Sequence, residues 1–406
     1  MITSLRKRLT LFLRLLLCAV FVALAIRGVA IHDRVSFHVS NDPDSAIEVG
    51  RLKIERTNDV IVKRADGTEA SIPRSRIAKD EGGQDLIERG LLTAFRETDK
   101  VFVLLAIVIF APVTPLQGWR LWIMLRAQDI HIPLIECIKI SFGGNFLNYV
   151  FMIGTTSGDV FKIYCAASHT ETHKTEAVAT ILLDRAVGLV GLLLVMSVAG
   201  LGLSNDPVVR RIGTVAFLIC SLILVALAVF SANWMRALAP TRLMAKLPWA
   251  DHFRRMFEAT CRLTEHRGLV FGAIGLAAVL QTFAIGAFVS CARALHMDFS
   301  GDKVWDYFSF IATGHVVAAI PISAQGLGTM ELTYKTLFLG THGTLSQLLC
   351  LAIWVRLLQL LWSLPGVAVT MIGGWRKKGE ALIANAELPL DGADPPLAEP
   401  NSTVAK

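Results

Sequence analysis

The chain has 406 residues, of which 53% are hydrophobic and only 18% charged, and its formal net charge is +7. About a quarter of the residues in soluble domains are charged, so this composition favours a lipid environment. The basic residues cluster in short segments beside apolar runs, which fits the positive-inside rule better than nucleic-acid binding. A soluble nucleic-acid-binding protein is therefore excluded, and a multi-pass membrane protein is predicted.

Residues 1–33 are predicted to form an N-terminal transmembrane anchor. Three basic residues, Arg6, Lys7 and Arg8, precede an apolar run over residues 9–31. Although Ala23-Leu24-Ala25 resembles a signal-peptide cleavage site, the run is longer than an ordinary signal core, which favours an uncleaved anchor. With or without cleavage, the segment that follows is expected to be exported.

Residues 34–100 are predicted to form a small extracytoplasmic β-rich domain. Polar and apolar residues alternate over residues 51–56, and Ala65-Asp66-Gly67 after residues 60–63 is a hairpin signal. The segment has few large apolar residues, so its core must be small. This composition favours a spacer or cap, while a docking module for a partner or for lipid head groups stays open.

Residues 101–375 are predicted to form the transmembrane domain. An apolar helix of about 20 residues spans a bilayer. With the anchor, about six spans are expected, five of them at residues 101–125, 181–203, 212–230, 269–289 and 348–372. The arginines and lysines of residues 236–267 and 376–378 predict that these segments lie on the cytoplasmic side, together with a disordered Pro-rich tail over residues 376–406.

This topology predicts two opposed re-entrant hairpins. If the basic segments share the cytoplasmic face, residues 130–167 must enter and leave by that face. Residues 304–339 must then enter and leave by the outer face. The predicted fold class is an all-α polytopic membrane protein with about six full spans and two re-entrant helical hairpins.

Both hairpins contain residues that ordinary membrane helices avoid. Irregular backbone at membrane depth survives only beside protein or a water-filled cavity, so each break predicts an internal polar cavity. Paired breaks of this kind indicate the midplane site of a transporter. Asp159 and Lys162, at i,i+3, and Glu331 and Lys335, at i,i+4, are each expected to share a helix face. The candidate site residues in the hairpins are Asn145, Asn148, Gly158, Asp159, Lys162, Pro321, Ser323, Gly326, Gly328 and Glu331.

Asp184 and Arg185 form a third charged element inside an apolar stretch, where an unpaired charge would be costly. Arg185 is the residue expected to bind a lipid phosphate. Structural ion pairs that lock the bundle are the alternative interpretation for these charges. For Arg356 a structural pair is favoured, and for His315 a hydrogen-bonded core position.

Other motifs predict no cofactor, metal site or ATPase. The seven cysteines lack zinc-ligand spacing. His169 and His173 are four residues apart, but the glutamate between them is misplaced for a zinc protease. No phosphate-binding P-loop is present, which excludes an ATP-driven pump within one chain.

Three blocks in chain order resemble the lysylphosphatidylglycerol synthase transmembrane family. They are residues 144–148 leading to Ser157-Gly158-Asp159-Val160-Phe161-Lys162, then residues 182–188, and then residues 320–331. The last block, Pro-x-Ser-x-x-Gly-x-Gly-x-x-Glu, is the most specific. The resemblance covers roughly residues 101–375.

The resemblance implies a helical bundle that moves a lipid or lipid-linked head group between leaflets of the inner membrane. The implied partners are membrane lipids, namely an anionic phospholipid or a lipid-linked substrate, and a homo-oligomer is possible. Where the family has a proline and an arginine, this chain has residues 154–157. It also carries the β unit, and without the C-terminal aminoacyl-transfer domain synthesis of a lysyl-lipid is not supported. The residues implied to line the lipid path are Asp159, Lys162, Asp184, Arg185 and Glu331.

Three functions are compatible with these features. The leading hypothesis is a flippase-like lipid transporter without enzymatic activity. The second is a membrane-embedded transferase, or its accessory subunit, that acts on a polyprenyl-linked sugar with Asp159 or Glu331 as the base. The third is a membrane scaffold that transports nothing.

Overall fold

The computed structural model describes three long parts of the chain. They are residues 30–151, 157–230 and 267–372, with Val20 and Ala23, and with gaps at residues 41–44, 65, 80–84, 86, 171–172, 302, 321–322 and 324–325. Most of the predicted anchor, the basic segment 236–267 except Arg267, and the whole predicted tail lie outside the described residues. The predicted site residue Pro321 also lies outside them.

The N-terminal unit is a five-stranded antiparallel sheet with the strand order β4-β3-β2-β1-β5. The predicted β unit is therefore confirmed as a sheet. A short 3₁₀ helix, η1 (Arg74–Arg76), and the helix α2 (Leu91–Arg96) complete the unit. The strands are β1 (Arg34–His38), β2 (Ile47–Glu55), β3 (Asp59–Lys63), β4 (Glu69–Pro73) and β5 (Ile87–Glu88).

Alternation along the strands gives the sheet one buried face. Phe37, Val60 and Val62 are fully buried in a small apolar cluster. The predicted hairpin joins β3 to β4, where the Asp66 carboxylate accepts the backbone N–H of Thr68 at 2.9 Å. This small core agrees with the shortage of large apolar residues in the segment.

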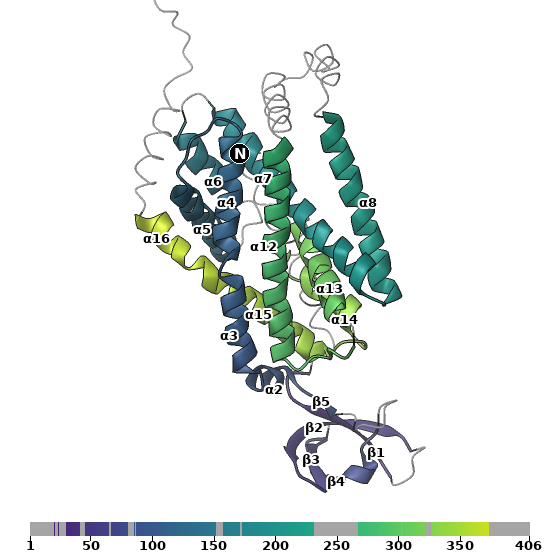
Figure 1. The fold of residues 1–406 in the computed structure, drawn as a ribbon. Coiled ribbons are helices and arrows are strands. Elements are labelled where there is room, and N and C mark those ends of the chain that lie inside the picture. Colours follow the sequence, from purple (N-terminus) through teal and green to yellow (C-terminus); the bar gives the residue numbers. More distant parts are fainter. Residues whose placement is uncertain are drawn as a thin grey trace, which may run out of the picture.

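The rest of the described chain is helical (Figure 1). Five helical segments in the described residues are long and apolar enough to cross a membrane: Lys100–Arg126, Lys174–Leu203, Pro207–Ala226, Gly268–Ala294 and Leu345–Ser363. The helices are α3 (Lys100–Phe110), α4 (Val113–Arg126), α5 (Leu134–Phe151), α6 (Ser157–Ser168), α7 (Lys174–Val198) with the π-helical turn η2 (Ala199–Leu203), α8 (Pro207–Phe230), α12 (Arg267–Ala294), α13 (Lys303–Ala319), α14 (Thr329–Phe338), α15 (Leu345–Ser363) and α16 (Pro365–Ile372).

The five segments correspond to five of the six predicted spans. One of them is interrupted, because α3 ends at Phe110 and α4 begins at Val113. Pro112 lies between them, and proline can neither donate a backbone hydrogen bond nor fit inside a regular helix. The predicted span over residues 101–125 is therefore two helices rather than one.

Two helical hairpins lie where the glycine-rich breaks predicted them. Helix α5 packs along α6, and α13 packs along α14. Figure 1 shows the α5–α6 hairpin in the half of the bundle away from the sheet and the α13–α14 hairpin in the half near the sheet. The two hairpins therefore approach the middle of the bundle from opposite ends.

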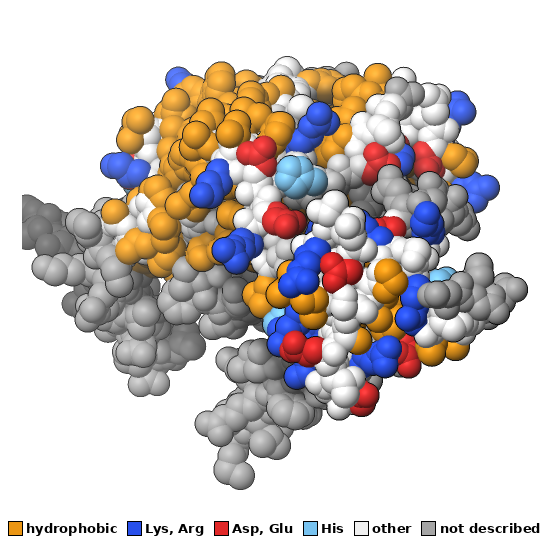
Figure 2. Space-filling model, turned by 90° about the horizontal axis from the view of Figure 1, so that it is seen from below, with side chains coloured by type: hydrophobic (Ala, Val, Ile, Leu, Met, Phe, Trp, Pro, Cys, Tyr) orange, Lys and Arg blue, Asp and Glu red, His pale blue; other side chains and the backbone are white. Residues whose placement is uncertain are grey.

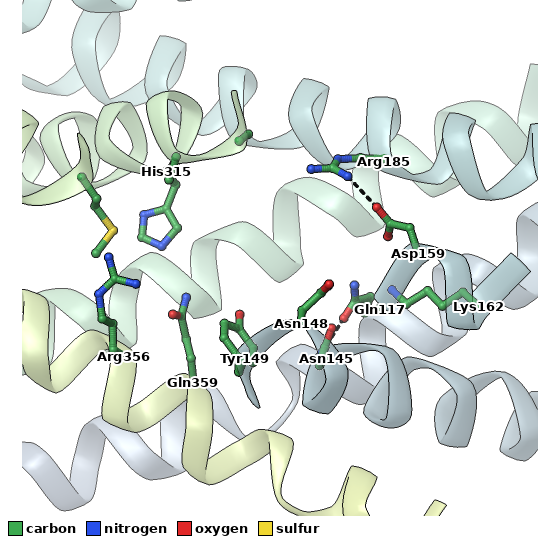
Figure 3. Close-up of a pocket in the computed structure, with 13 residues that line it drawn as sticks. Gln117, Asn145, Asn148, Tyr149, Asp159, Lys162, Arg185, His315, Arg356 and Gln359 are labelled. Carbon is green, nitrogen blue, oxygen red and sulfur yellow. Dashed lines mark hydrogen bonds and ion pairs between the residues drawn. The ribbon is translucent and has the colours of Figure 1, made fainter. Parts of the chain in front are cut away.

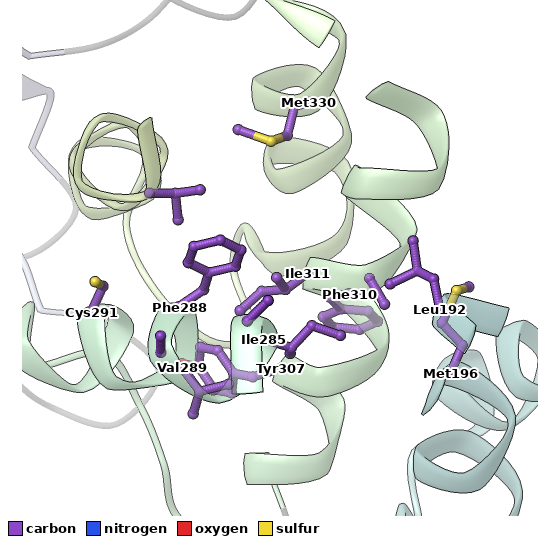
Figure 4. Packing of buried hydrophobic residues seen from close by; sticks show 14 of the residues in the cluster. Leu192, Met196, Ile285, Phe288, Val289, Cys291, Tyr307, Phe310, Ile311 and Met330 are labelled. Atoms are coloured by element: carbon purple, nitrogen blue, oxygen red, sulfur yellow. The ribbon is translucent and has the colours of Figure 1, made fainter. Parts of the chain in front are cut away.

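Helix α12 packs with one face against α3, α4, α7, α13 and α15. Phe288 of α12 and Ile311 of α13 are almost fully buried in this core (Figure 4). A Cβ atom on Gly191 of α7 would lie 2.7 Å from the backbone of Ala277 in α12. Because lipid tails are as apolar as the helices, close packing of small residues contributes much of the association here.

The outer surface of the bundle is strongly apolar. Val101 and Leu104 of α3, Leu222 of α8 and Phe271 of α12 are each more than 60% exposed. Figure 2, seen from the sheet end, shows hydrophobic side chains spread over the helical part and charged side chains on the sheet unit. An exposed apolar surface of this kind is typical of a protein in contact with lipid.

The sheet unit is attached to the bundle through α2 and α15. The ring of Phe95 stacks on Trp354, with 5.0 Å between the ring centroids and 6° between their planes. Trp354 also donates a hydrogen bond to Thr98, and Ser346 donates one to the backbone oxygen of Ala30. Contacts from α2, from Thr98 after it and from Ala30 before β1 therefore join the sheet unit to the helix that carries Arg356.

Candidate functional site

A polar cavity of about 260 Å³ lies among α4–α7 and α13–α15, where the two hairpins meet (Figure 3). Ten of its thirteen lining residues have polar side chains. Polar and charged groups inside a membrane bundle are costly, so such a concentration favours a functional site. The polar residues are Gln117, Asn145, Asn148, Tyr149, Asp159, Lys162, Arg185, His315, Arg356 and Gln359.

Each hairpin is tied to the following long helix by a carboxylate and an arginine. In the first hairpin, Arg185 donates to Asp159 at 2.5 Å. In the second, the Nε and Nη2 groups of Arg356 donate to Glu331 at 3.0 and 2.7 Å. Asp159 is the third residue of α6 and Glu331 the third of α14, and their partners follow 26 and 25 residues later. The two hairpins therefore repeat one local arrangement.

These ion pairs are not the ones that the sequence positions suggested. Asp159 and Lys162 were expected to share one helix face, and so were Glu331 and Lys335. Instead, each carboxylate binds an arginine of the next helix. Arginine's planar group can give two hydrogen bonds in one orientation, as Arg356 does, which a lysine cannot match.

In the first hairpin, Asn148 and Gly158 join α5 to the start of α6. The Asn148 Oδ1 atom accepts the backbone N–H of Gly158 at 2.7 Å and the Ser157 hydroxyl at 3.2 Å. It thereby caps a helix end whose N–H groups have no partner within the helix. A Cβ on Gly158 would lie 2.1 Å from the carbonyl oxygen of Gly144, so the helices can approach this closely only at glycine.

In the second hairpin, the glycine-rich block forms the turn before α14. Gly326 and Gly328 have φ angles of +67° and +82°, which glycine adopts at little steric cost. The Gly328 N–H donates to Glu331 Oε2 at 2.7 Å, and the Thr329 hydroxyl contacts Ser323 and the Gly326 carbonyl, both at 3.1 Å. Glu331 therefore holds the turn with one oxygen and the arginine of α15 with the other.

Asp184 pairs with Arg120 of α4 rather than acting beside Arg185. Arg120 Nε and Nη2 donate to the two carboxylate oxygens at 2.7 and 3.1 Å, and the two side chains are only 5% and 6% exposed. Consecutive helix residues point about 100° apart, so Asp184 faces α4 while Arg185 faces α6. Asp184 was predicted to line the lipid path, but it lies in this buried pair and is not part of the cavity wall.

Lys162 borders the cavity from α6 and is 3% exposed. Its side chain crosses Gly144, where a Cβ would lie 2.7 Å from the lysine Cε. Among the described residues, no hydrogen bond or ion pair is found for its amino group. The cavity therefore receives a buried cation that the surrounding described side chains do not pair.

A second cavity of about 210 Å³ adjoins the first and reaches α12 and the break between α3 and α4. Asn145 lies between the cavities and donates to Gln117 at 2.9 Å. The second cavity also has apolar lining residues, among them Phe110, Val113 and Leu280. The two cavities share Gln117, Asn145, Tyr149, His315 and Gln359.

A family model described as the lysylphosphatidylglycerol synthase TM region matches residues 89–366, which is more than half of the chain. The chain belongs to this family. The match begins and ends somewhat earlier than the predicted range 101–375, and it includes both hairpins and both cavities. No match was found among the curated proteins.

The family blocks account for most of the cavity-facing charge. Asn145, Asn148, Asp159, Lys162 and Arg185 all lie in the cavity wall, as the sequence led us to expect. Their role in a lipid path stays a prediction. The remaining described candidates do not line this cavity but form hydrogen bonds in the turns and ion pairs next to it: Gly158, Asp184, Ser323, Gly326, Gly328 and Glu331.

Several wall residues lie outside the family blocks and were not predicted. Gln117 and Gln359 were missed, and so was Arg120 behind the wall. Arg356 and His315 were assigned structural roles, yet both also line the cavity. A usable signal exists, because Gln117 and Arg120, like Arg356 and Gln359, are polar residues at i,i+3 within otherwise apolar helices.

The described part of the chain contains no group of three or more His, Cys, Asp or Glu side chains that could hold a metal ion. The polar cavity can bind a ligand by hydrogen bonds and by ion pairs. Guanidinium groups, amides and an ammonium group are suited to phosphate and hydroxyl oxygens.

Proposed function

We propose that this protein moves the head group of a phospholipid or lipid-linked substrate between the leaflets of the inner membrane. One observation carries this proposal. A cavity lined by Lys162, Arg185 and Arg356 lies between two opposed hairpins inside a bundle whose outer surface is apolar. A polar head group needs such a route through hydrocarbon, whereas its acyl chains can remain in lipid.

In this proposal the hairpins re-enter the bilayer from opposite faces and act as two gates. A lipid phosphate that enters the cavity accepts hydrogen bonds from Arg185 or Arg356 and competes with Asp159 or Glu331. Exchange of partners loosens one hairpin at a time. Opening of one hairpin while the other stays fastened is the requirement of alternating access.

The arginine pairs favour transport over a transferase reaction. A transferase would use Asp159 or Glu331 as a base, but each carboxylate is bound to an arginine. These hydrogen bonds occupy carboxylate oxygens that a base would need for the proton of its substrate. We therefore propose a transporter without enzymatic activity, acting on membrane lipids.

Reconstitution of the full chain in lipid vesicles tests this function. Fluorescent lipids with several head groups are distributed over both leaflets, and dithionite then quenches the label in the outer leaflet. We expect faster loss of the inner-leaflet label than in protein-free vesicles, and slower loss with Arg356→Gln. Arg74→Gln is a matched control, because its ion pairs lie on the sheet surface.

Two outcomes would contradict the proposal. The first is a rate equal to that of protein-free vesicles for every lipid class. The second is an Arg356→Gln protein that translocates lipid at the wild-type rate per molecule, because the cavity arginine would then contribute nothing to transport.

A further inference from the structure

The charges around the two cavities do not balance. Each of the three acids there is bound to its own arginine. Among the residues that the structure describes, one positive charge remains, on Lys162. In that part of the chain, the charged side chains that line the cavities or directly contact their lining residues are Arg120, Asp159, Lys162, Asp184, Arg185, Glu331 and Arg356.

The immediate surroundings of Lys162 do not neutralise it. The charged groups near it are Asp159, Asp184, Arg120 and Arg185, which are two acids and two arginines. Because each acid already binds an arginine, this group of four is neutral as a whole. An isolated ammonium group at 3% exposure is costly to bury, so the site favours a ligand that supplies one negative charge.

The other free groups of the cavity are neutral. His315 Nδ1 lies 2.9 Å from the carbonyl oxygen of Ile311 and must donate to it, so Nε2 of the neutral ring is an acceptor. That Nε2 atom is buried and has no partner among the described residues. Nor is a hydrogen bond found there for the side chains of Tyr149 and Gln359. Hydroxyl groups, which both donate and accept, complement this set.

The cavity is also small. Sites for drug-sized ligands measure roughly 300–1,000 Å³, and this cavity measures about 260 Å³. It therefore has room for one compact head group, to which the adjoining cavity adds about 210 Å³.

We propose that the cavity selects a lipid whose phosphodiester carries one negative charge and whose head group is otherwise neutral and rich in hydroxyls. Lys162 is the counter-ion of the phosphate, and His315, Tyr149 and Gln359 bind the hydroxyls. This inference rests on the proposed function and names its substrate class. Among the described cavity residues a cationic head group meets no unpaired carboxylate, and a diphosphate carries more charge than one lysine offsets.

Native mass spectrometry of the full chain, purified in mild detergent, tests the selection. The probes are phosphatidylglycerol, zwitterionic phosphatidylethanolamine, a cationic aminoacylated phosphatidylglycerol and a polyprenyl diphosphate. We expect phosphatidylglycerol to be retained at least about tenfold better than the other three, which corresponds to one charge-assisted hydrogen bond. Lys162→Gln should remove this preference, and Lys162→Arg should keep it.

Equal retention of the four lipids by the wild-type protein would overturn the inference, and so would a preference for any other probe. A preference that survives in Lys162→Gln would also overturn it. If Lys162→Gln fails to fold, the wild-type panel and Lys162→Arg still decide. The vesicle assay separates the two proposals: selective retention without translocation would contradict transport alone, and translocation without selectivity would contradict this inference alone.

Discussion

Both hairpins have an ion pair between a carboxylate and an arginine of the next helix, but they differ in the charge that they bring to the cavity. In both, the third residue of the short helix α6 or α14 is an acid, and an arginine of the next long helix binds it. Only the first hairpin adds Lys162 to the cavity, because Lys335 of the second lines neither cavity. The arginine pair is therefore common to both hairpins, and the proposed selection by charge assigns a further role to the first hairpin alone.

The largest expected effect is on stability and concerns the ion pair of Arg120 with Asp184, which has no counterpart beside the second hairpin among the described residues. Arg120→Met leaves the Asp184 carboxylate buried without its partner, which should lower the free energy of unfolding by about 3–5 kcal/mol. Unfolding in mixed detergent micelles measures this change. The double variant Arg120→Met/Asp184→Leu should recover most of the loss, and a failure to recover would show that Arg120 stabilises the bundle by other contacts.

Because both hairpins have this carboxylate–arginine ion pair, neutralising the acid should slow translocation equally in the two. Asp159→Asn and Glu331→Gln each weaken a charge-assisted hydrogen bond to arginine and should slow translocation about tenfold or more. Glu331→Gln retains an oxygen that can accept the Gly328 N–H, so the turn is expected to survive. Vesicle translocation rates provide the comparison. A normal rate in one of the two variants would break the equivalence of the hairpins.

A steric test compares the same two turns. A Cβ atom on Gly158 would lie 2.1 Å from the Gly144 carbonyl oxygen, and one on Gly326 would lie 2.3 Å from the Cβ of Ala318. We expect Gly158→Ala and Gly326→Ala each to destabilise the protein by about 1–3 kcal/mol. Gly272→Ala in α12 is the control, because no atom lies within 4 Å of its new Cβ. Melting temperatures that match the control would contradict the close packing.

The smallest expected effect is at Lys335, the counterpart of Lys162. Lys335→Gln should change retention of phosphatidylglycerol by no more than about twofold, whereas Lys162→Gln should abolish the preference. Native mass spectrometry of the two variants side by side makes the measurement. Equal losses would mean that both hairpins, and not the first alone, contribute charge to the site.

The positions of the hairpins could be predicted, and the partners of their charges could not. Glycine-rich polar turns interrupt apolar helices visibly, so the breaks near Gly158 and Gly326 are local features of the sequence. The pairing of Asp184 with Arg120 joins residues 64 positions apart. Spacing along one helix favours the lysines at i,i+3 and i,i+4, and only the packing of neighbouring helices brings the arginines closer.

Averaging the hydropathy over a whole span also hid two residues that line the cavities. Arg120 and Gln117 lie in a segment that is apolar enough overall to cross a membrane. Their charge and polarity matter because they face the bundle interior, which depends on how α4 is rotated against α5 and α7. The same span hides the interruption at Pro112, although that proline is a local signal that predicts a helix break.

The stack of Phe95 on Trp354 joins the sheet unit to α15 two residues before Arg356. If α15 tilts when Glu331 is released, these contacts predict that the sheet moves with it. A spin label on β4 would then report the state of the second hairpin through the movement of the sheet.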